Sequence, residues 1–349
     1  MSGGQAIEIP GADEFMPLVQ VHGPDDVRIG PVPVPQAGPR DVVVRVAACG
    51  ICGSDLGYIA KGGLTGPSDR PLPLGHELAG TIAAVGSEVA GLRPGMRVVV
   101  NPDSNLIGGG GPGAFAPYLL VHNARRDLDV LPIPDHLPFH LAALAEPLSV
   151  ALHGVNRAEV NPHSKVVVLG AGPIGLGVVI GLRARGVRDI VSVDLSEQRL
   201  ELARRLGAAA TVNPKRQDLR EVLIERHGSS EIFGWPMVNS DVYIDATGAG
   251  SVLQQVVQMS RTGARLVVVA LHRQPVPVDM VQVMAKELVI TGAIAYPTEF
   301  PEAVGLLTAG AADFEAKISH RFDFSEFSHA LSVARDTERA VKVVVEFAD

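Results

Sequence analysis

Cysteine and aromatic residues are scarce in this sequence. Its 349 residues include two cysteines, Cys49 and Cys52, and aromatic side chains make up 4% of the total. A disulfide framework needs more cysteines than this, so the sequence favours a reducing compartment, the cytoplasm. With so few aromatic rings, we expect cores built mainly from Val, Leu, Ile and Ala.

A basic stripe and a membrane-length apolar run are also missing. The formal net charge is −8, and the nearest basic cluster, which includes Arg199, alternates with glutamates as on a solvated helix face. The longest apolar stretch, residues 166–182, is short for a membrane span and contains glycines and a proline. Residues 1–10 have no basic start followed by an apolar run, so we expect no secretory signal. These absences argue against nucleic acid and membranes as partners.

The pattern of apolar residues predicts two domains. The first third is rich in strands, such as residues 41–48 (DVVVRVAA) and 96–100 (MRVVV). From about residue 162, predicted strands at 165–169, 190–193, 241–246, 264–270 and 287–291 alternate with helical patterns such as 174–185 and 196–206. This alternation is typical of a doubly wound parallel sheet, the Rossmann class of α/β domain.

The predicted boundaries follow from this change of pattern. We expect a dinucleotide-binding domain over residues 159–295, and a catalytic domain that combines residues 1–158 with the tail, 296–349. The tail contains two helical patterns and a last strand at 341–347 (VKVVVEF). Residues 232–240 (IFGWPMVNS) are interpreted as a loop inside the nucleotide domain.

A glycine-rich turn predicts the dinucleotide site. The sequence GAGPIG at residues 170–175 follows an apolar strand and opens a helix, which is the context that such a motif requires. Gly170 permits the tight turn, Gly172 lets the backbone approach a pyrophosphate, and Gly175 lets helix and strand pack closely. The acid at the end of the next strand, Asp194, would bind the ribose hydroxyls and repel a 2′-phosphate, which favours NAD over NADP. The residues expected to contact the cofactor are Gly170, Gly172, Pro173, Ile174, Gly175, Asp194 and Arg199.

A second group of residues has the chemistry of a zinc site. Cys52 is followed by the pair His76-Glu77 and later by Glu146. Thiolate, imidazole and carboxylate ligands suit zinc with a fourth position left open. The alternative for the Cys49-x-x-Cys52 pair is redox chemistry or half of a zinc knuckle, but no second pair of cysteines exists.

Five motifs together resemble the zinc-containing medium-chain dehydrogenase/reductase superfamily, which includes the alcohol dehydrogenases. They are GICGSD, LGHELAG, AALAEPLSVALHG, VLGAGPIG and DATG, in this order along nearly the whole chain. The nearest branch is that of the sorbitol, butanediol and threonine dehydrogenases. The resemblance implies a β-rich, GroES-like catalytic domain beside the Rossmann domain. It also implies NAD-linked oxidation of a secondary alcohol, diol or polyol to the ketone, in a homo-oligomer that is a tetramer or a dimer.

The resemblance also implies a role for each motif residue. Cys52 and His76 match zinc ligands, and the third ligand position is shared between Glu77 and Glu146, with no basis for a choice between them. Asp55 matches a residue that holds the ligating histidine. Ser54 matches the hydroxyl that contacts the substrate alcohol and begins its deprotonation.

Two departures from the family pattern change these expectations. Residues 101–113 (NPDSNLIGGGGPG) contain none of the four cysteines that bind a structural zinc in most relatives, so we expect one zinc per chain. Gly57 stands where many relatives carry the histidine that ends the proton relay. Two other functions stay open: a metal-free quinone or enoyl reductase of the same superfamily, and a non-catalytic nucleotide-binding relative.

Overall fold

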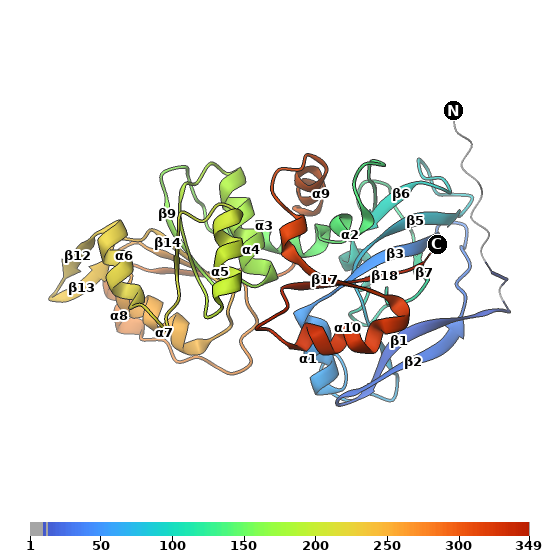
Figure 1. Cartoon of the computed structure of the whole chain (residues 1–349), viewed down its shortest axis with the longest axis horizontal. Coiled ribbons are helices and arrows are strands. Elements are labelled where there is room, and N and C mark those ends of the chain that lie inside the picture. The colour runs from blue at the N-terminus through green and yellow to red at the C-terminus, as the bar shows by residue number, and fades with distance from the viewer. Residues whose placement is uncertain (1–9, 12, 349) are drawn as a thin grey trace. The chain divides into compact units, whose positions relative to one another are not determined.

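The computed structural model describes residues 10, 11 and 13–348, and the chain divides into two compact units (Figure 1). The first unit comprises Met1–Glu146, Phe300–Gly310 and Ile318–Asp349, and the second comprises Pro147–Glu299 and Ala311–Lys317. The fold is a mixed α/β one, with a β-rich first unit and a parallel sheet in the second, as the motifs predicted.

The second unit is built on a six-stranded parallel sheet. Its strand order is β11 (Ala210–Val212), β10 (Asp189–Val193), β9 (Lys165–Leu169), β14 (Val242–Asp245), β15 (Arg265–Val268) and β16 (Val289–Gly292). The central strand β9 is buried along four of its five residues, because helices cover both faces of such a sheet. The helices are α3 (Ala145–Arg157), α4 (Pro173–Ala184), α5 (Glu197–Arg205), α6 (Leu219–His227), α7 (Gly250–Met259) and α8 (Met280–Ala285).

Helix α3 explains where the second unit begins. The change of unit falls at Glu146–Pro147, whereas the expected boundary between residues 158 and 159 follows the end of this helix. Two glycines of α4, Gly177 and Gly181, leave so little room that added Cβ atoms would lie 2.7 Å from Ala151 and 3.0 Å from Leu152. Helix α3 therefore packs closely on α4 and belongs with the nucleotide sheet.

The segment 232–240 is not a loop, as predicted, but mostly a β-hairpin. Strand β12 (Ser229–Ile232) pairs antiparallel with β13 (Trp235–Val238). The turn residues Phe233 and Gly234 have φ values of 50° and 79°, the left-handed pair that a type I′ hairpin turn requires. The prediction was wrong because Phe-Gly is not the usual Asn-Gly signal, and because Pro236 argues against a strand.

The first unit is built from two sheets. In the larger one the order is β17 (Ile318–Asp323), β18 (Lys342–Glu346), β3 (Val42–Ile51), β5 (Glu77–Val85), β6 (Arg97–Val100) and β8 (Val130–Pro132), and β7 (Tyr118–Val121) also pairs with β3. The smaller sheet has the order β2 (Asp26–Pro33), β1 (Phe15–Gly23) and β4 (Leu72–Pro73). The helices are α1 (Gly53–Lys61), α2 (Phe139–Ala142), α9 (Phe300–Thr308) and α10 (Phe327–Arg335), with short 3-10 helices at Pro102–Asn105 and Phe324–Glu326. A third 3-10 helix, Glu315–Lys317, belongs to the second unit.

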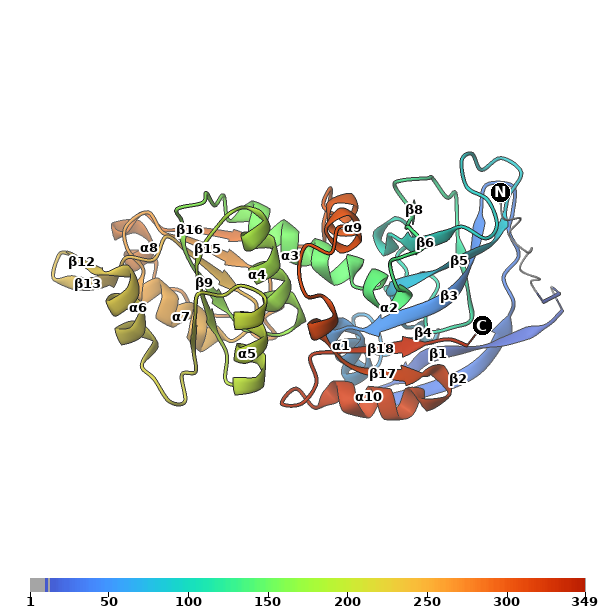
Figure 2. The ribbon, with the colours of Figure 1, turned by 45° about the horizontal axis from the view of Figure 1, so that its top comes forward.

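The last strand of the chain, β18, lies inside the larger sheet, between β17 and β3. Figure 2 shows β18, in red, beside β3, in blue, and the two strands pair antiparallel with Val343 opposite Ile51. The core around them is mostly Val, Leu, Ile and Ala, with an edge-to-face contact of Phe115 and Phe327 at 4.9 Å. Among the residues that the structure describes, no helix is long and apolar enough to span a bilayer.

Candidate active site

The turn between β3 and α1 positions the cysteine of the predicted metal site. Cys52 follows the last residue of β3 and is the N-cap of α1, with extended backbone angles of −95° and 155°. Its backbone N–H donates to Asp55 Oδ2 at 2.9 Å, so that a carboxylate in the first turn of the helix holds the turn in place. The thiol is half-buried.

The second ligand-bearing turn lies between β4 and β5. Gly75 has a φ of 92°, and an added Cβ would lie 2.7 Å from the backbone N of Phe115, so only glycine fits there. Its N–H donates to the other oxygen of Asp55, at 3.4 Å. The next residue is His76, whose Nδ1 lies 3.6 Å from the same Asp55 oxygen. Asp55 therefore contacts both turns and lies beside the imidazole.

His76 is only partly exposed and has polar neighbours. Its Nε2 lies 3.4 Å from the hydroxyl oxygen of Ser54. Burial alone would lower the pKa of His76, but the negative charges of Asp55 and Cys52 hold it well above its usual value. Burial also raises the pKa of Asp55, and the nearby His76 offsets this only in part. The imidazole is thus surrounded by acidic groups, whose negative charge a bound cation would balance.

Three side chains converge as a donor set. The ligand atoms of Cys52, His76 and Glu77 all lie within 4.8 Å of one another, in the only such cluster among residues 10, 11 and 13–348. One sulfur, one nitrogen and one oxygen donor suit zinc, whose bonds to such atoms are about 2.0–2.3 Å long. Movements of about 1 Å would bring the three donors to these bond lengths. The residues present therefore fit a zinc ion with one position left open.

Glu146 lies outside this cluster but close to its charges. Burial raises its pKa to about 7. The negative charge of Glu77 adds to this rise, whereas the positive charge of His76 acts in the opposite direction. Of the two candidate third ligands, the structure brings only Glu77 into the donor set.

The other cysteine is a packing residue in this structure. Cys49 is fully buried on β3, and burial raises its thiol pKa well above the usual value. The charges of Asp55 and Glu77 act in the same direction. Such a thiol is not a ready metal ligand, which leaves Cys52 as the sulfur donor.

Sequence analysis missed the residue that holds Glu77. Lys342, on β18, places its Nζ 2.6 Å from each carboxylate oxygen of Glu77. The only signal in the sequence was a single lysine in an otherwise apolar strand, VKVVVEF. Gly50 was missed as well: an added Cβ there would lie 2.1 Å from Glu77 Oε2.

The glycine turn of the second unit has the geometry of a phosphate cradle. Gly170 has a φ of 95°, and the N-terminus of α4 begins directly after Gly172. An added Cβ on Gly175 would lie 1.8 Å from the carbonyl oxygen of Gly170, so helix and turn are in closest contact there. Pro173 and Ile174 form the first turn of α4, whose free N–H groups favour an anion.

Asp194 and Arg199 flank this turn. One oxygen of Asp194 accepts from the N–H of Ala171 at 2.7 Å, and the other accepts from the N–H of Ser196 at 2.9 Å. The carboxylate is thus fixed between the glycine turn and the start of α5. Arg199, on α5, reaches over Gly172, since its Nη1 would lie 3.7 Å from an added Cβ. The structure therefore gathers all seven predicted cofactor residues at one end of the sheet.

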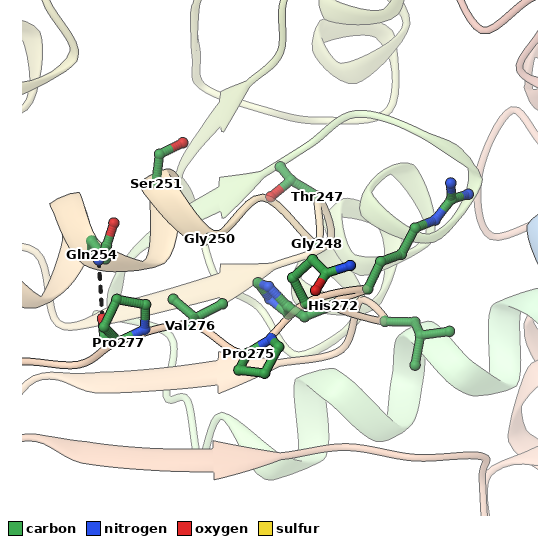
Figure 3. A pocket seen from close by; sticks show the side chains of 12 residues that line it. Thr247, Gly248, Gly250, Ser251, Gln254, His272, Pro275, Val276 and Pro277 are labelled. Atoms are coloured by element: carbon green, nitrogen blue, oxygen red, sulfur yellow. Dashed lines mark hydrogen bonds between the residues drawn. The ribbon is translucent and has the colours of Figure 1, made fainter.

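A pocket of about 570 Å³ lies at the carboxyl ends of β14 and β15 (Figure 3). Its wall includes Thr247, which follows β14, and His272, which follows β15. His272 Nε2 lies 2.7 Å from Oδ2 of the fully buried Asp245, so this contact joins the end of β14 to the loop that follows β15. Ligands of open parallel sheets bind outside the carboxyl ends of the strands, which is where this pocket lies.

Comparisons with known proteins identify the family of both domains. The alcohol dehydrogenase GroES-like domain profile matches residues 38–135, and the zinc-binding dehydrogenase profile matches residues 173–309. Sorbitol dehydrogenase from Mus musculus is 30% identical over 93% of this chain and 94% of its own length.

Solved structures give the same result. The crystal structure of 2R,3R-butanediol dehydrogenase from Bacillus subtilis superposes with a TM-score of 0.84 at 28% identity, covering 95% of this chain and 99% of that one. A zinc-binding dehydrogenase from Sinorhizobium meliloti 1021, bound to NADP, superposes with a TM-score of 0.83 at 28% identity, covering 96% and 100%.

Proposed function

We propose a reaction for this chain, which belongs to the zinc-containing alcohol dehydrogenase family and is an enzyme. It oxidises a secondary alcohol of the diol or polyol class to the ketone, with NAD as hydride acceptor. The observation that carries the proposal is the donor set of Cys52, His76 and Glu77 in one chain with a dinucleotide turn. A metal-free reductase would not need this set, and a non-catalytic relative would not need to keep it intact. The substrate class rests on the relatives, which act on sorbitol and butanediol by name.

Zinc held by Cys52, His76 and Glu77 would act as a Lewis acid that polarises the alcohol oxygen and favours its deprotonation. The chain's own residues then have three tasks. The hydroxyl of Ser54, 3.4 Å from His76 Nε2, accepts the alcohol proton and passes it outward. Asp55 keeps the imidazole oriented through its contact with Nδ1. Because Gly57 replaces the histidine of many relatives, the proton leaves Ser54 by a route that does not involve that side chain.

The preference for NAD over NADP rests on Asp194. Its carboxylate is held at the end of β10 by two backbone N–H groups, where a ribose 2′-phosphate would meet a negative charge. Arg199 does not offset this, because it reaches toward Gly172 and hence toward the pyrophosphate. We expect the nicotinamide half of the cofactor to extend from this turn toward the carboxyl ends of β14 and β15.

One zinc per chain is part of the proposal. The sequence holds two cysteines, of which Cys49 is buried in the core and Cys52 lies in the donor set. Residues 101–113, where most relatives bind a second zinc, supply no thiol. We also propose a cytoplasmic location, since a thiolate ligand needs a reducing compartment.

A homo-oligomer, dimer or tetramer, completes the proposal. Strand β16 is the last in the order of the parallel sheet, so no other strand of the described chain pairs with its outer edge. Val289 and Ile290 on this strand are 41% and 39% exposed, and Ile294 beyond it is 85% exposed. An apolar sheet edge is a template for a second copy of itself related by a two-fold axis. Light scattering should show more than one chain, and Ile290→Glu should shift the protein toward the monomer.

The test of the proposed activity combines metal analysis with a substrate panel. Protein purified without added metal should contain one zinc per chain and should reduce NAD with vicinal diols and polyols faster than with primary alcohols. Cys52→Ala should lose zinc and activity together, whereas the control Cys49→Ala should keep both. Full turnover in metal-free Cys52→Ala protein would overturn the zinc assignment, and NAD binding without any reduction would favour the non-catalytic alternative.

A further inference from the structure

A buried lysine is the closest charged neighbour of the metal-binding carboxylate. Lys342 is 2% exposed, and its Nζ makes three contacts: 2.6 Å to Glu77 Oε1, 2.6 Å to Glu77 Oε2 and 3.0 Å to the carbonyl oxygen of Ile51. An ammonium has three N–H donors, so all of them are used. The ammonium is therefore fixed in place by its own hydrogen bonds.

We propose that Lys342 is the positioning residue that restricts Glu77 to binding the metal through a single oxygen, and so keeps one coordination position open for the substrate. The inference rests on the proposed function, since it presupposes a metal held by Cys52, His76 and Glu77. It adds a residue from the last strand to the site. The three donor residues alone do not determine whether Glu77 binds through one oxygen or two.

The geometry of the carboxylate supports this task. A metal chelated by both oxygens of a carboxylate must lie between them, on the outer side of the group. The ammonium of Lys342 is equally distant from both oxygens and so occupies that place. A metal can then bind only through a lone pair on one carboxylate oxygen, on the side that faces away from the lysine. Glu77 is then a one-oxygen ligand, and the site has three protein ligands and an open fourth position.

The main chain prevents the carboxylate from turning away. In the larger sheet Gly50 lies opposite Glu77 on one side and opposite Val344 on the other. An added Cβ on Gly50 would lie 2.1 Å from Glu77 Oε2, so the carboxylate lies directly against the backbone of β3. The side chain is thus confined between this backbone and the ammonium.

The buried charge of Lys342 is paired, because its ammonium is in direct contact with the carboxylate of Glu77. A buried pair of this kind contributes little to stability by itself, yet loss of one partner leaves the other charge unpaired. The third bond, to Ile51, joins the pair to the residue before Cys52. One ammonium therefore fixes the carboxylate relative to the thiol.

Cobalt(II) is the probe for the coordination number, because its visible d–d bands are strong in four-coordinate sites and weak in five-coordinate ones. The full-length protein is stripped and reloaded with Co²⁺, and Cys52→Ala identifies the thiolate charge-transfer band by its loss. We compare the parent with Lys342→Met, which keeps the length of the side chain, and with Lys342→Arg, which keeps the charge. Lys286→Met is the matched control, since Lys286 is a fully buried lysine of the second unit, bonded to the carbonyls of Val257 and Gln258.

We expect strong four-coordinate bands in the parent and in Lys286→Met. Lys342→Met should still bind one cobalt through Cys52, but with weakened, shifted d–d bands, and its zinc form should turn over about 10- to 100-fold more slowly. Lys342→Arg should restore the bands in part, which a purely structural role would not predict.

Each other result has a definite meaning. Parent-like bands and turnover in Lys342→Met would overturn the inference, and so would a folded Lys342→Met that binds no cobalt. If this variant does not fold, the cobalt spectrum of the parent protein is the test. Weak five-coordinate bands in the parent would mean that Lys342 does not restrict Glu77 to one oxygen, and would overturn the inference. A parent that binds no cobalt at all refutes the proposed function itself.

Discussion

The glycine turn of the second unit offers two substitutions that separate folding from cofactor binding. An added Cβ on Gly175 would lie 1.8 Å from the backbone oxygen of Gly170, a distance that no non-bonded pair of atoms tolerates. An added Cβ on Gly172 would meet nothing nearer than Arg199 Nη1, at 3.7 Å. The backbone angles of Gly172, −72° and −174°, are ones that alanine adopts without strain.

These distances set opposite expectations for the two variants. In Gly175→Ala the turn must move, and overpacking of this kind costs about 1–3 kcal/mol of the free energy of unfolding. Gly172→Ala should leave that free energy unchanged or raise it by about 0.4–1 kcal/mol, because alanine restricts the unfolded chain. Its methyl group, however, occupies the space in which a pyrophosphate approaches the N-terminus of α4. We expect its Kd for NADH to rise at least tenfold, or about 1.4 kcal/mol.

The assay measures both quantities on the same samples. Urea unfolding gives the free energy of unfolding of each variant, and titration of NADH fluorescence gives the Kd. The reasoning predicts that Gly172→Ala is stable but binds poorly, and that Gly175→Ala is impaired in both respects. A stable Gly172→Ala protein with the parental Kd would refute the placement of the pyrophosphate at this turn.

Three further predictions concern single side chains of the two sites. Asp194→Ala should lower the ratio of kcat/KM for NAD to that for NADP by tenfold or more, and an unchanged ratio would count against its role at the ribose. Ser54→Ala should reduce turnover about 10²- to 10⁴-fold with zinc content unchanged, whereas parental turnover would mean that another group takes the proton. Burial raises the pKa of Glu146 from 4.5 to about 7, so between these pH values the unfolded chain binds fewer protons and the free energy of unfolding falls as pH rises. In metal-stripped protein, the free energy of unfolding of Glu146→Gln should therefore decrease by about 1–3 kcal/mol less than that of the parent between pH 5 and pH 8. If urea unfolding shows the same pH dependence for the two proteins, the raised pKa of Glu146 is contradicted.

Local sequence patterns were sufficient where a segment's structure depends on its own residues. The predicted strand 165–169 is the same as β9, and the predicted helix 196–206 encloses α5, with Ser196 as its N-cap. The glycine turn was predictable for the same reason, because strand, turn and helix follow one another within a few residues. Resemblance supplied the donor set, whose members Cys52 and His76 are far apart in sequence.

What the sequence could not show depends on contacts between distant segments. Lys342 meets Glu77 across 265 positions and Ile51 across 291, through the pairing of β18 with β3. No local pattern encodes which strand lies beside which, because a strand's periodicity fixes only its two faces. The hairpin of β12 and β13 failed for the opposite reason. Its turn is local, but Phe233 takes a left-handed conformation that sequence patterns reserve for Asn or Gly.

The first unit should hold its metal site ready before any metal binds. Asp55 is 1% exposed and accepts from the backbone N–H groups of Cys52 and Gly75, so both ligand-bearing turns are fixed by hydrogen bonds of the main chain. The apolar core of this unit contains none of the three donor side chains. We therefore expect zinc binding to be separate from folding, unlike in zinc fingers, which unfold without metal. Removal of zinc by a chelator should abolish activity with an unchanged far-UV circular dichroism spectrum, and added zinc should restore it. A chelated protein that loses its secondary structure would show instead that the metal, and not Asp55, holds the two turns together.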